Sequence, residues 1–519
     1  MKKLLLLSLL IPMLAYCGPA QKEVVPDPDP DPDPEKVDPE PQPEPEAVLT
    51  LISKATVDAD VNGGSALLRF QTNHAWTITT ENKWVHVPEE SASGQPADNT
   101  IAVRIKFDDN TSPVAREGKV LITAGKAQQV VTLNQPKDPL AVPATPLENG
   151  STVLATNPNV EKFLTEVTYP DKDWSYTEVL NFYGGFNGKT YNEYGEEDPA
   201  GKAFDWDNQP NSDQPMSYSI NWKESDLDGD NEMVFTLTDK YGWKMQSTLA
   251  GGSLFVNVSN LVPNDQYTYS VIADGSGKVV TEGSFNTTGH LHQVFFRSGC
   301  RNGRDLGGWP TVDGKTVKFR KLYRGGRMQS ETVSPTGARQ ILAEGIGAQL
   351  DLRNSDKLNQ PVDPALAFLA PGIEEGGKWM LTHGNTDGNF GKQCFEFVVN
   401  CLRENKPVYF HCSLGRDRTG TLDILLLGLL GVREGDISKA YEVTYFAPVG
   451  YSVSSSEKSG NPKPIFRNTR KEWVYSDVVP YFWSLSTNDT FANGVERYLL
   501  DVAGVSQKDI DDFRNMMLE

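Results

Sequence analysis

A cysteine and an arginine close to residue 415 have the spacing needed to act on an anion. Cys412 and Arg418 are separated by five residues, which is enough chain to curl once around a tetrahedral oxyanion such as phosphate. A thiol held in such a turn ionises easily, because backbone amide dipoles and a guanidinium stabilise the thiolate. The thiolate can attack phosphorus and form a thiophosphate intermediate. We therefore predict Cys412 as a nucleophile and Arg418 as the group that clamps the oxyanion.

The residues between and after this pair fit the same chemistry. Arg418 can donate two hydrogen bonds to phosphoryl oxygens. Gly415 lets the backbone approach the ligand closely, and Thr419 can hydrogen-bond the sulfur as it departs. The reaction requires no metal or other cofactor. The predicted phosphate-binding residues are Ser413, Leu414, Gly415, Arg416 and Thr419.

Apolar runs on either side indicate how this loop is held. Val408–Phe410 precede it, and a longer apolar run over residues 421–430 follows it. This order predicts a strand, a tight loop and a buried helix. A loop at a helix N-terminus presents unpaired N–H groups and the positive end of the helix dipole, which suits an oxyanion. A buried structural cysteine before a helix is the alternative, and the coincidence of several fixed positions disfavours it.

The stretch from His411 to Gly420 resembles the signature loop of the cysteine-based protein tyrosine phosphatases, which reads His-Cys, five residues, Arg, then Ser or Thr. Asp417, directly before the arginine, narrows the resemblance to bacterial tyrosine phosphatases whose loop ends Lys-Asp-Arg-Thr-Gly. Arg416 stands here in place of that lysine. The resemblance implies hydrolysis of phosphotyrosine.

The resemblance extends over residues 290–519. Asn302–Gly308 is similar to the Asn-x-Arg-Asp-Leu-Gly-Gly stretch of the same group, and Leu322–Gly325 to its Leu-Tyr-Arg-Ser stretch, with Gly325 where Ser is usual. Ile346–Arg353 is similar to its next strand, which ends Asp-Leu-Arg. The resemblance implies an α/β domain with a central, mainly parallel sheet, helices on both sides, and a site at the C-terminal ends of the strands.

The leaving oxygen needs a general acid, and two aspartates are candidates. Asp417 matches, by resemblance, the position of the acid in myotubularin-type lipid phosphatases, although it could instead fix Arg418 as a structural acceptor. Asp387 lies in a separate Gly- and Asn-rich stretch whose spacing to Cys412 is short. We favour Asp417. Further candidates for substrate binding or for the acid are Arg304, Asp305, Asp351 and Arg353, of which Asp351 is expected to anchor Arg353 or the sheet end.

Charge gives a separate indication of the substrate. Residues 301–327 carry eight basic side chains against two acidic ones, in a chain of formal net charge −20. This pattern suggests an anionic substrate drawn to one face, with ordinary strand-edge lysines and arginines as the alternative. Beside phosphotyrosine, the charge of Arg416 leaves phosphoinositides or inositol phosphates open as substrates. The basic side chains are Arg301, Arg304, Lys315, Lys318, Arg320, Lys321, Arg324 and Arg327.

The N-terminus is typical of an exported protein. Lys2 and Lys3 precede an apolar stretch that ends at Leu14, a pattern of export signals that is too short to span a bilayer. Residues 14–17 resemble a bacterial lipobox with Cys17 as the lipidated residue, so that residues 1–17 form a lipoprotein signal. A soluble secreted protein with an ordinary cleavage site is the alternative. We expect a lipid anchor in the bacterial outer membrane, facing either the periplasm or the cell surface.

Residues 18–46 form a Pro/Asp/Glu tract that cannot bury a core and serves as an extended spacer. Much of the net charge lies there. The charge and the pI of about 4.9 argue against general nucleic-acid binding.

Residues 47–137 alternate apolar and polar side chains in short bursts, which predicts the strands of a β-sandwich. Trp76, Trp84, Arg116–Gly118 and Gln135 resemble a BACON domain, an immunoglobulin-like module of exported Bacteroidetes proteins. The resemblance implies a glycan or protein contact or a plain spacer. We expect both tryptophans to belong to the core rather than to a binding platform.

Residues 138–289 also read as strands. Leu261–Val271 resembles the late corner of a fibronectin type III sandwich, where a tyrosine hydroxyl bonds back to the backbone. The part up to about residue 210 is longer than that fold needs. We therefore expect two all-β modules before the α/β domain.

The remaining cysteines are Cys300, Cys394 and Cys401, an odd set that gives no disulfide framework. One pair among them, or a redox-sensitive disulfide with Cys412, stays open. A rival hypothesis is a surface binding protein whose phosphatase-like fold only reads phosphate groups, and the intact Cys412, Arg418 and Thr419 speak against it.

Overall fold

A computed structural model of the chain describes most of the residues that follow the N-terminal spacer. The described residues are 46–61, 63–97, 99–110, 115–137, 144–169, 213–229, 231–249, 252–296, 301–328, 333, 335–354, 360–449, 463–464 and 471–519. The predicted export signal with Cys17, nearly all of the spacer, and Cys300 lie outside them. Within the described residues, no helix has the length and apolar character needed to cross a bilayer.

Residues 47–135 fold into two β-sheets that enclose one apolar core. Along one strand, Val103, Ile105 and Phe107 are buried while the residues between them are exposed, which confirms the predicted alternation. One sheet has the order β1 (Leu49–Leu51), β3 (Gly64–Thr72), β7 (Ile101–Phe107), β5 (Val85–His86). The other has the order β2 (Thr56–Asp58), β9 (Ala127–Gln135), β8 (Arg116–Ala124), β4 (Trp76–Thr79), β6 (Ser93–Gly94), and a short helical turn covers Glu89–Ser91.

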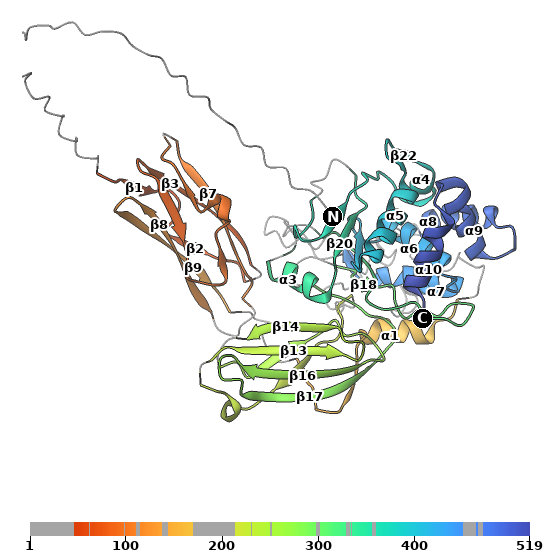
Figure 1. Cartoon of the computed structure of the whole chain (residues 1–519), viewed down its shortest axis with the longest axis horizontal. Coiled ribbons are helices and arrows are strands. Elements are labelled where there is room, and N and C mark those ends of the chain that lie inside the picture. The colour runs from red at the N-terminus through yellow and green to blue at the C-terminus, as the bar shows by residue number, and fades with distance from the viewer. Residues whose placement is uncertain are drawn as a thin grey trace, which may run out of the picture. The chain divides into compact units, whose positions relative to one another are not determined.

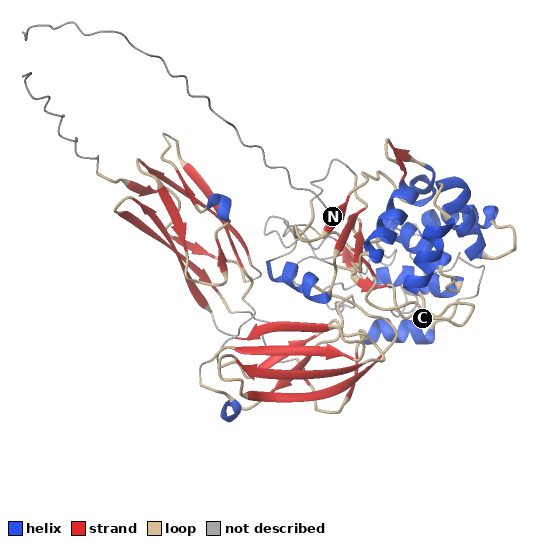
Figure 2. Ribbon diagram, viewed as in Figure 1, coloured by secondary structure: helices blue, strands red, loops and turns tan. Residues whose placement is uncertain are grey.

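The described residues between 144 and 288 include a second pair of sheets around their own core (Figure 2). The hydroxyl of Tyr267 accepts a hydrogen bond from the backbone N–H of Val262 at 2.8 Å, which is the backbone contact expected for a tyrosine at this corner. One sheet has the order β10 (Thr145–Pro146), β12 (Tyr218–Asn221), β15 (Phe255–Val258). The other has the order β11 (Thr152–Leu154), β17 (Val279–Thr288), β16 (Gln266–Ala273), β13 (Met233–Asp239), β14 (Lys244–Leu249), and Glu224–Asp226 form a helical turn.

A helix between β11 and β12 belongs to the core of the C-terminal domain. Helix α1 (Pro158–Glu166) starts with proline at its first position, and the side chain of Asn157 caps it by accepting from the N–H of Asn159 at 3.0 Å. Its buried residues join the apolar cluster that fills residues 290–519, and α1 lies beside α7 (Glu434–Glu442) in Figure 1. The core of the C-terminal domain therefore starts well before residue 290. The buried side chains of α1 are Val160, Phe163 and Leu164.

The C-terminal domain is built on one five-stranded sheet. Its order is β18 (Arg304–Asp305), β19 (Leu322–Gly325), β24 (Val408–His411), β20 (Ala348–Asp351), β21 (Ala367–Leu369). All neighbouring strands are parallel except β18 and β19, so the predicted mainly parallel sheet is confirmed. Strand residues alternate between a large apolar cluster on one face and a smaller one on the other, which includes residues of α3 (Pro335–Glu344).

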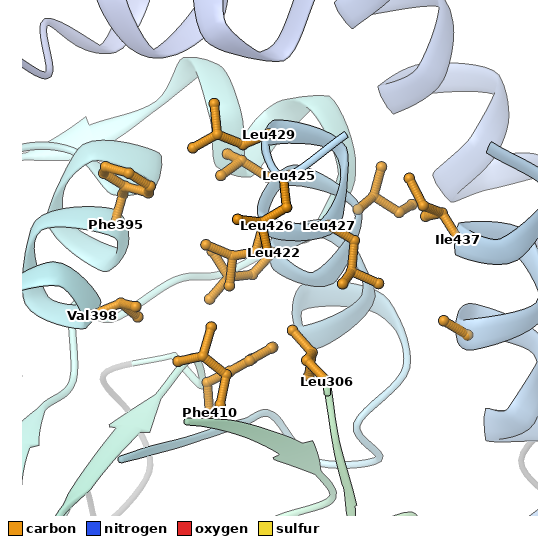
Figure 3. Packing of buried hydrophobic residues seen from close by; sticks show 14 of the residues in the cluster. Leu306, Phe395, Val398, Phe410, Leu422, Leu425, Leu426, Leu427, Leu429 and Ile437 are labelled. Carbon is orange, nitrogen blue, oxygen red and sulfur yellow. The ribbon is translucent and has the colours of Figure 1, made fainter. Parts of the chain in front are cut away.

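The central helix α6 (Asp417–Leu429) follows β24 directly and is buried on every side, as the apolar run in the sequence predicted. Figure 3 shows leucines of α6 packed among Phe395 of α5 (Phe390–Arg403), Phe410 of β24 and Ile437 of α7. Each buried leucine side chain contributes about 2 kcal/mol, so the chain is firmly held on both sides of the loop between β24 and α6.

The other helices of this domain are α3 (Pro335–Glu344), α4 (Gly377–Thr382), α5 (Phe390–Arg403), α8 (Lys471–Leu485), α9 (Phe491–Arg497) and α10 (Gln507–Met517), with helical turns at Val443–Phe446 and Tyr498–Ala503. Two short hairpins pair β22 (Gly384–Asn385) with β23 (Gly388–Asn389) and β25 (Pro448–Val449) with β26 (Lys463–Pro464).

Candidate active site

The Cys412 loop (residues 412–418) turns from the C-terminal end of β24 into the first turn of α6, as the sequence predicted. Cys412 is buried, and Ser413 beside it is exposed. Gly415 has a φ of 72°, and a Cβ there would lie 2.4 Å from the carbonyl carbon and oxygen of Gly325 at the end of β19. Only glycine fits this close approach in a left-handed conformation.

The loop changes the acidity of the Cys412 thiol. Burial by itself raises the pKa of this thiol, but the charge of Arg418 and the hydroxyl and amide of Thr419 lower it, and the net result is a pKa below the ordinary value. Elsewhere in the domain the opposite holds: burial raises the pKa of Cys394, and that of Cys401 to about 11. Both are free thiols on α5. Cys412 is thus the described cysteine whose surroundings favour the thiolate.

Three successive carbonyl groups of the loop point outward, because each accepts a hydrogen bond from a residue outside the loop. The carbonyl of Ser413 accepts from the N–H of Arg327 at 3.2 Å. The carbonyls of Leu414 and Gly415 both accept from Nδ2 of Asn302, at 3.2 and 3.1 Å. In a planar trans peptide the next N–H points to the opposite side from the carbonyl. The three amides that follow these carbonyls therefore face the inside of the loop, as an oxyanion cradle requires.

A buried ion pair supports the same loop from below. Nη2 of Arg324 donates to the carbonyl of Gly415 at 2.7 Å, and Nη1 of Arg324 bonds Asp423 of α6. Both side chains are 1% exposed. A pair this deeply buried needs its hydrogen bonds to offset desolvation. Arg324 therefore ties β19, α6 and the loop carbonyl into one unit.

Arg418 is oriented by a neighbouring segment, residues 371–377. Nη1 of Arg418 donates to the carbonyl of Ile373 at 2.8 Å. The N–H of Gly377 donates to Oγ1 of Thr421 at 2.7 Å, and a Cβ on Gly376 would lie 2.9 Å from the backbone N of Arg418. The segment thus rests directly on the first turn of α6. One N–H of Arg418 is fixed this way, which leaves the other guanidinium donors for an anion.

The two candidate acids occupy different places. Both oxygens of Asp417 accept from the guanidinium of Arg416, at 2.9 and 3.1 Å, so the structural partner of Asp417 is Arg416 and not Arg418. The Asp417 side chain remains about one third exposed. Asp387 lies at the exposed tip of the β22–β23 hairpin, where its N–H bonds Oδ1 of Asn385 at 2.9 Å. Of the two, Asp417 is the one that lies in the same loop as Cys412 and Arg418.

Two segments of the chain match known families. Residues 297–519 match the model described as "Tyrosine phosphatase family". The chain carries a tyrosine phosphatase family domain. Residues 74–136 match the BACON model, described as "Putative binding domain, N-terminal". These matches confirm the resemblance to tyrosine phosphatases and the resemblance to a BACON domain.

A relative from Cupriavidus necator, described as a "Putative tyrosine-protein phosphatase", is 28% identical over 163 residues, which cover 27% of this chain and 59% of the relative. The chain thus spans less than two thirds of that relative.

Solved structures with some similarity include a Bacteroides ovatus GH5 xyloglucanase in complex with a XXXG heptasaccharide, at 17% identity and a TM-score of 0.16, covering 21% of this chain and 27% of that one. Another is a Bacteroides thetaiotaomicron protein solved by NMR, at 17% identity and a TM-score of 0.13, covering 20% and 98%. Scores this low carry no argument about fold or function.

Four further residues proposed from the sequence are buried in the phosphatase-family domain and bonded internally. Arg304 donates to the carbonyls of Asn302 and Ala440, at 3.2 and 2.7 Å. Asp305 accepts from the N–H of Gly307 at 2.8 Å and pairs with His292 at 3.0 Å. The structure therefore does not support their proposed role in substrate binding.

Asp351 and Arg353 bond each other through several contacts of 2.7–3.1 Å. Asp351 thus anchors Arg353, as the sequence reading expected. Because both side chains are buried, the structure does not support a role for either in binding substrate or as the acid.

The cationic stretch 301–327 also differs from expectation. Arg301, Arg304 and Arg324 are buried, and Arg320 is ion-paired with Glu344 and Asp239. A buried guanidinium has to be paired or hydrogen-bonded, and these arginines are. The prediction that the stretch draws an anionic substrate to one face is therefore wrong for these four residues.

His411 is a neutral structural residue. Burial lowers its pKa to about 4. Nε2 of His411 lies 3.0 Å from the side-chain amide nitrogen of Gln349, and Nδ1 lies 3.3 Å from the carbonyl oxygen of Cys412. Because the amide nitrogen of Gln349 can only donate, Nε2 of His411 accepts and Nδ1 donates. The ring thus fixes the backbone of the nucleophile.

The sequence placed Asn302 in a motif, and Arg324 in a motif and in the basic stretch 301–327, but it did not reveal their contacts with the Cys412 loop. The partners of Asn302 are 112 and 113 residues away in the chain, and no spacing rule connects them. The available signal is the asparagine before a glycine, because asparagine is enriched at left-handed backbone positions. Asn302 has such a conformation, with a φ of 60°.

Proposed function

We propose that the phosphatase-family domain is a cysteine-dependent phosphomonoester hydrolase. The observation that carries the proposal is the Cys412 loop itself: a thiol of lowered pKa lies at the start of a turn whose carbonyls are held outward. The inward amides and Arg418 bind the phosphoryl oxygens and stabilise the charge that develops on them.

The reaction has two steps. The Cys412 thiolate attacks phosphorus, forming the S–P bond while the bond to the leaving oxygen breaks. Asp417, oriented by Arg416, gives that oxygen its proton. Asp417 then takes a proton from a water molecule that attacks the phosphocysteine, which releases inorganic phosphate and restores the thiolate. Thr419, whose side chain is buried and whose hydroxyl lowers the pKa of the Cys412 thiol, supports the departing sulfur.

For the substrate we propose phosphotyrosine, with dual specificity toward phosphoserine and phosphothreonine included. The sequence left phosphoinositides and inositol phosphates open because of the extra charge on Arg416. Arg416 is paired with Asp417, which removes much of that argument. These polyphosphorylated substrates remain the second candidate.

For the remainder of the chain we propose export and a lipid anchor at Cys17, with residues 18–46 as a spacer. The anchor would hold the enzyme at the bacterial outer membrane, on its periplasmic or outer face. We further propose that residues 47–137 and 138–289 are immunoglobulin-like and fibronectin type III-like sandwiches that contact glycan or protein or act as spacers.

Hydrolysis of p-nitrophenyl phosphate by the full chain tests the proposal. We expect turnover that Cys412→Ser abolishes, that Cys394→Ser leaves intact, that a chelator does not affect and that vanadate inhibits. Cys394 is a matched control because it is a buried free thiol of the same domain. Vanadate binding without turnover would instead support the rival hypothesis of a phosphate-reading binding protein. A panel of phosphotyrosine peptides, phosphoinositides and phytate then separates the substrate classes.

A further inference from the structure

A buried carboxylate reaches the phosphatase-family domain from outside the segment that matches the family. The Asp213 side chain is 2% exposed. Oδ2 of Asp213 accepts from Nε of Arg301 at 2.8 Å and from the backbone N–H of Asn302 at 3.1 Å, and Oδ1 accepts from Nη2 of Arg301 at 2.6 Å. A carboxylate with this burial is stable only when such donors surround it. Asp213 therefore fixes the backbone at Arg301 and Asn302.

The residue that Asp213 fixes is the one that holds the loop. Asn302 has a left-handed backbone. This conformation costs free energy for a residue with a Cβ, so surrounding contacts must offset the cost. Its N–H bonds Asp213, while its side-chain amide bonds the carbonyls of Leu414 and Gly415. The neighbouring carbonyl, of Arg301, accepts from the N–H of Gly326 at 2.7 Å. The contacts thus form one continuous path from Asp213 to the oxyanion cradle.

We propose that Asp213 is a positioning residue of the Cys412 loop and acts through Asn302. The inference rests on the proposed function, because displacing the loop lowers activity only if the loop binds an oxyanion. Asp213 fixes the backbone of Asn302, Asn302 fixes two loop carbonyls, and the planar peptides turn the next amides inward. Asp213 then helps to position the candidate catalytic loop, although it precedes the segment that matches the family.

The central experiment compares the full chain with Asp213→Ala. We expect the kcat for p-nitrophenyl phosphate to fall about tenfold or more, since a displacement on the order of 1 Å can cost 100-fold, with a smaller change in KM. We also expect the pH profile of Cys412 alkylation by iodoacetamide, followed by mass spectrometry of the Cys412 peptide, to shift to higher pH. A residue that only stabilises the fold would lower the melting temperature and leave this profile unchanged.

Two further variants test the path. Asn302→Gly removes the side-chain amide while tolerating the left-handed backbone, and it should give the same two effects. Adding Asp213→Ala to Asn302→Gly should then shift the alkylation profile no further, because residues on one path are not additive. Asp213→Asn keeps an oxygen that can accept the Asn302 N–H, so it should retain most of the activity. If Asp213→Ala does not fold, Asp213→Asn and Asn302→Gly decide the question.

Trp243→Phe is the matched control. Nε1 of Trp243 donates to the carbonyl of Glu344 at 3.0 Å, so this residue also joins residues 144–288 to the C-terminal domain, but it does not touch the path. The control should leave kcat and the alkylation profile at their wild-type values.

The outcomes separate the inference from the function on which it rests. Normal turnover and an unshifted profile in folded Asp213→Ala, or equal effects with and without the Asn302 side chain, would overturn the inference and leave the proposed function intact. If the wild-type chain hydrolyses no substrate, the proposed function fails. The alkylation profile and vanadate affinity of the same variants would still decide whether Asp213 positions the loop.

Discussion

The motif residues of the BACON module bond one another and the backbone of the module. The Arg116 guanidinium lies 4.2 Å above the ring of Trp84, and Nε of Arg116 donates to Oε1 of Gln135 at 2.7 Å. Nε2 of Gln135 donates to the backbone carbonyls of Asp60 and Asp108, at 2.7 and 2.8 Å. These side chains lie together in the module, and Trp84 packs against its core, as the sequence predicted.

The Cys412 loop uses its motif residues in the opposite way. The second layer, formed by Asn302 and Arg324, takes up the loop carbonyls, while the loop amides are turned inward. Arg418 bonds one backbone carbonyl and keeps further donors. Polar groups satisfied within the module stabilise a fold, whereas donors directed into the inside of a loop can bind a ligand. A match to a short motif does not distinguish these two uses, and the hydrogen-bond partners do.

The largest effect that would test this contrast is expected for Arg418→Ala. Losing the guanidinium removes a transition-state donor and the main charge that lowers the Cys412 pKa. We expect kcat to fall about 1000-fold and the alkylation profile of Cys412 to move to higher pH. Arg116→Ala is the counterpart in the BACON module and should leave kcat unchanged. Similar losses of turnover in both variants would contradict the distinction between the two regions.

The two regions should also respond to acid in different pH ranges. The folded-state pKa of His411 is lowered to about 4, so between pH 6.5 and 4 the unfolded chain binds a proton that the folded domain does not. Stability of the C-terminal domain is therefore fully present above pH 6.5 and falls as the pH drops to 4, by up to about 3 kcal/mol.

In the BACON module the comparable group is Asp108. Burial raises the pKa of Asp108, but hydrogen bonds and charges of His86 and Arg339 lower it to a net value below 3.8. Its contribution is present above pH 3.8 and is lost only below that. Hydrogen exchange of each region between pH 7 and 3 checks the order, and His411→Gln should flatten the upper range. Unfolding of the BACON module at a higher pH than the C-terminal domain would contradict this order.

Two glycines offer a matched pair of substitutions. At Gly415 a Cβ would meet the backbone of Gly325 at 2.4 Å, and at Gly118 it would meet Cζ2 of Trp84 at 2.5 Å. We expect Gly415→Ala to lower kcat about 100-fold by displacing the loop. Gly118→Ala should cost about 1–3 kcal/mol of unfolding free energy through overpacking and leave kcat unchanged. Kinetics and thermal unfolding of both variants measure the difference.

Parts of the fold that depend on neighbouring residues could be predicted from the sequence. The apolar runs predicted β24 and α6, and the spacing of Cys412 and Arg418 predicted the loop between them. Alternation gave the strands of the BACON module. Each of these rests on periodicity or on spacing within about ten residues, which a single sequence displays directly.

Contacts between distant segments could not be predicted. Helix α1 packs in a core that consists mostly of residues after 290, and Asp213 meets Arg301 across 88 residues. The charge of residues 301–327 pointed to a surface because a sequence does not show which arginines are buried with partners. The sequence offered Asp417 as a structural acceptor for Arg418, yet its carboxylate bonds Arg416, because side-chain geometry decides between adjacent residues.

The smallest effect is expected where the phosphatase-family domain behaves like the BACON module. Gly325, where related sequences resembling this one have Ser, is as tightly enclosed by Tyr409 as Gly118 is by Trp84: a Cβ would lie 2.0 Å from the Tyr409 hydroxyl and 2.9 Å from Cζ. Gly325→Ser should therefore cost about 1–3 kcal/mol of unfolding free energy and change kcat less than tenfold.

Tyr409→Phe should recover part of the Gly325→Ser loss, because it removes the nearest atom and leaves the ring carbon. Alone, Tyr409→Phe loses the hydrogen bond from its hydroxyl to the carbonyl of Gly326 at 3.2 Å, which costs about 1 kcal/mol. Thermal unfolding of the two single variants and the double variant measures the coupling. Additive losses would mean that Tyr409 does not determine the glycine, and a large drop in kcat would mean that Gly325 belongs functionally with Gly415.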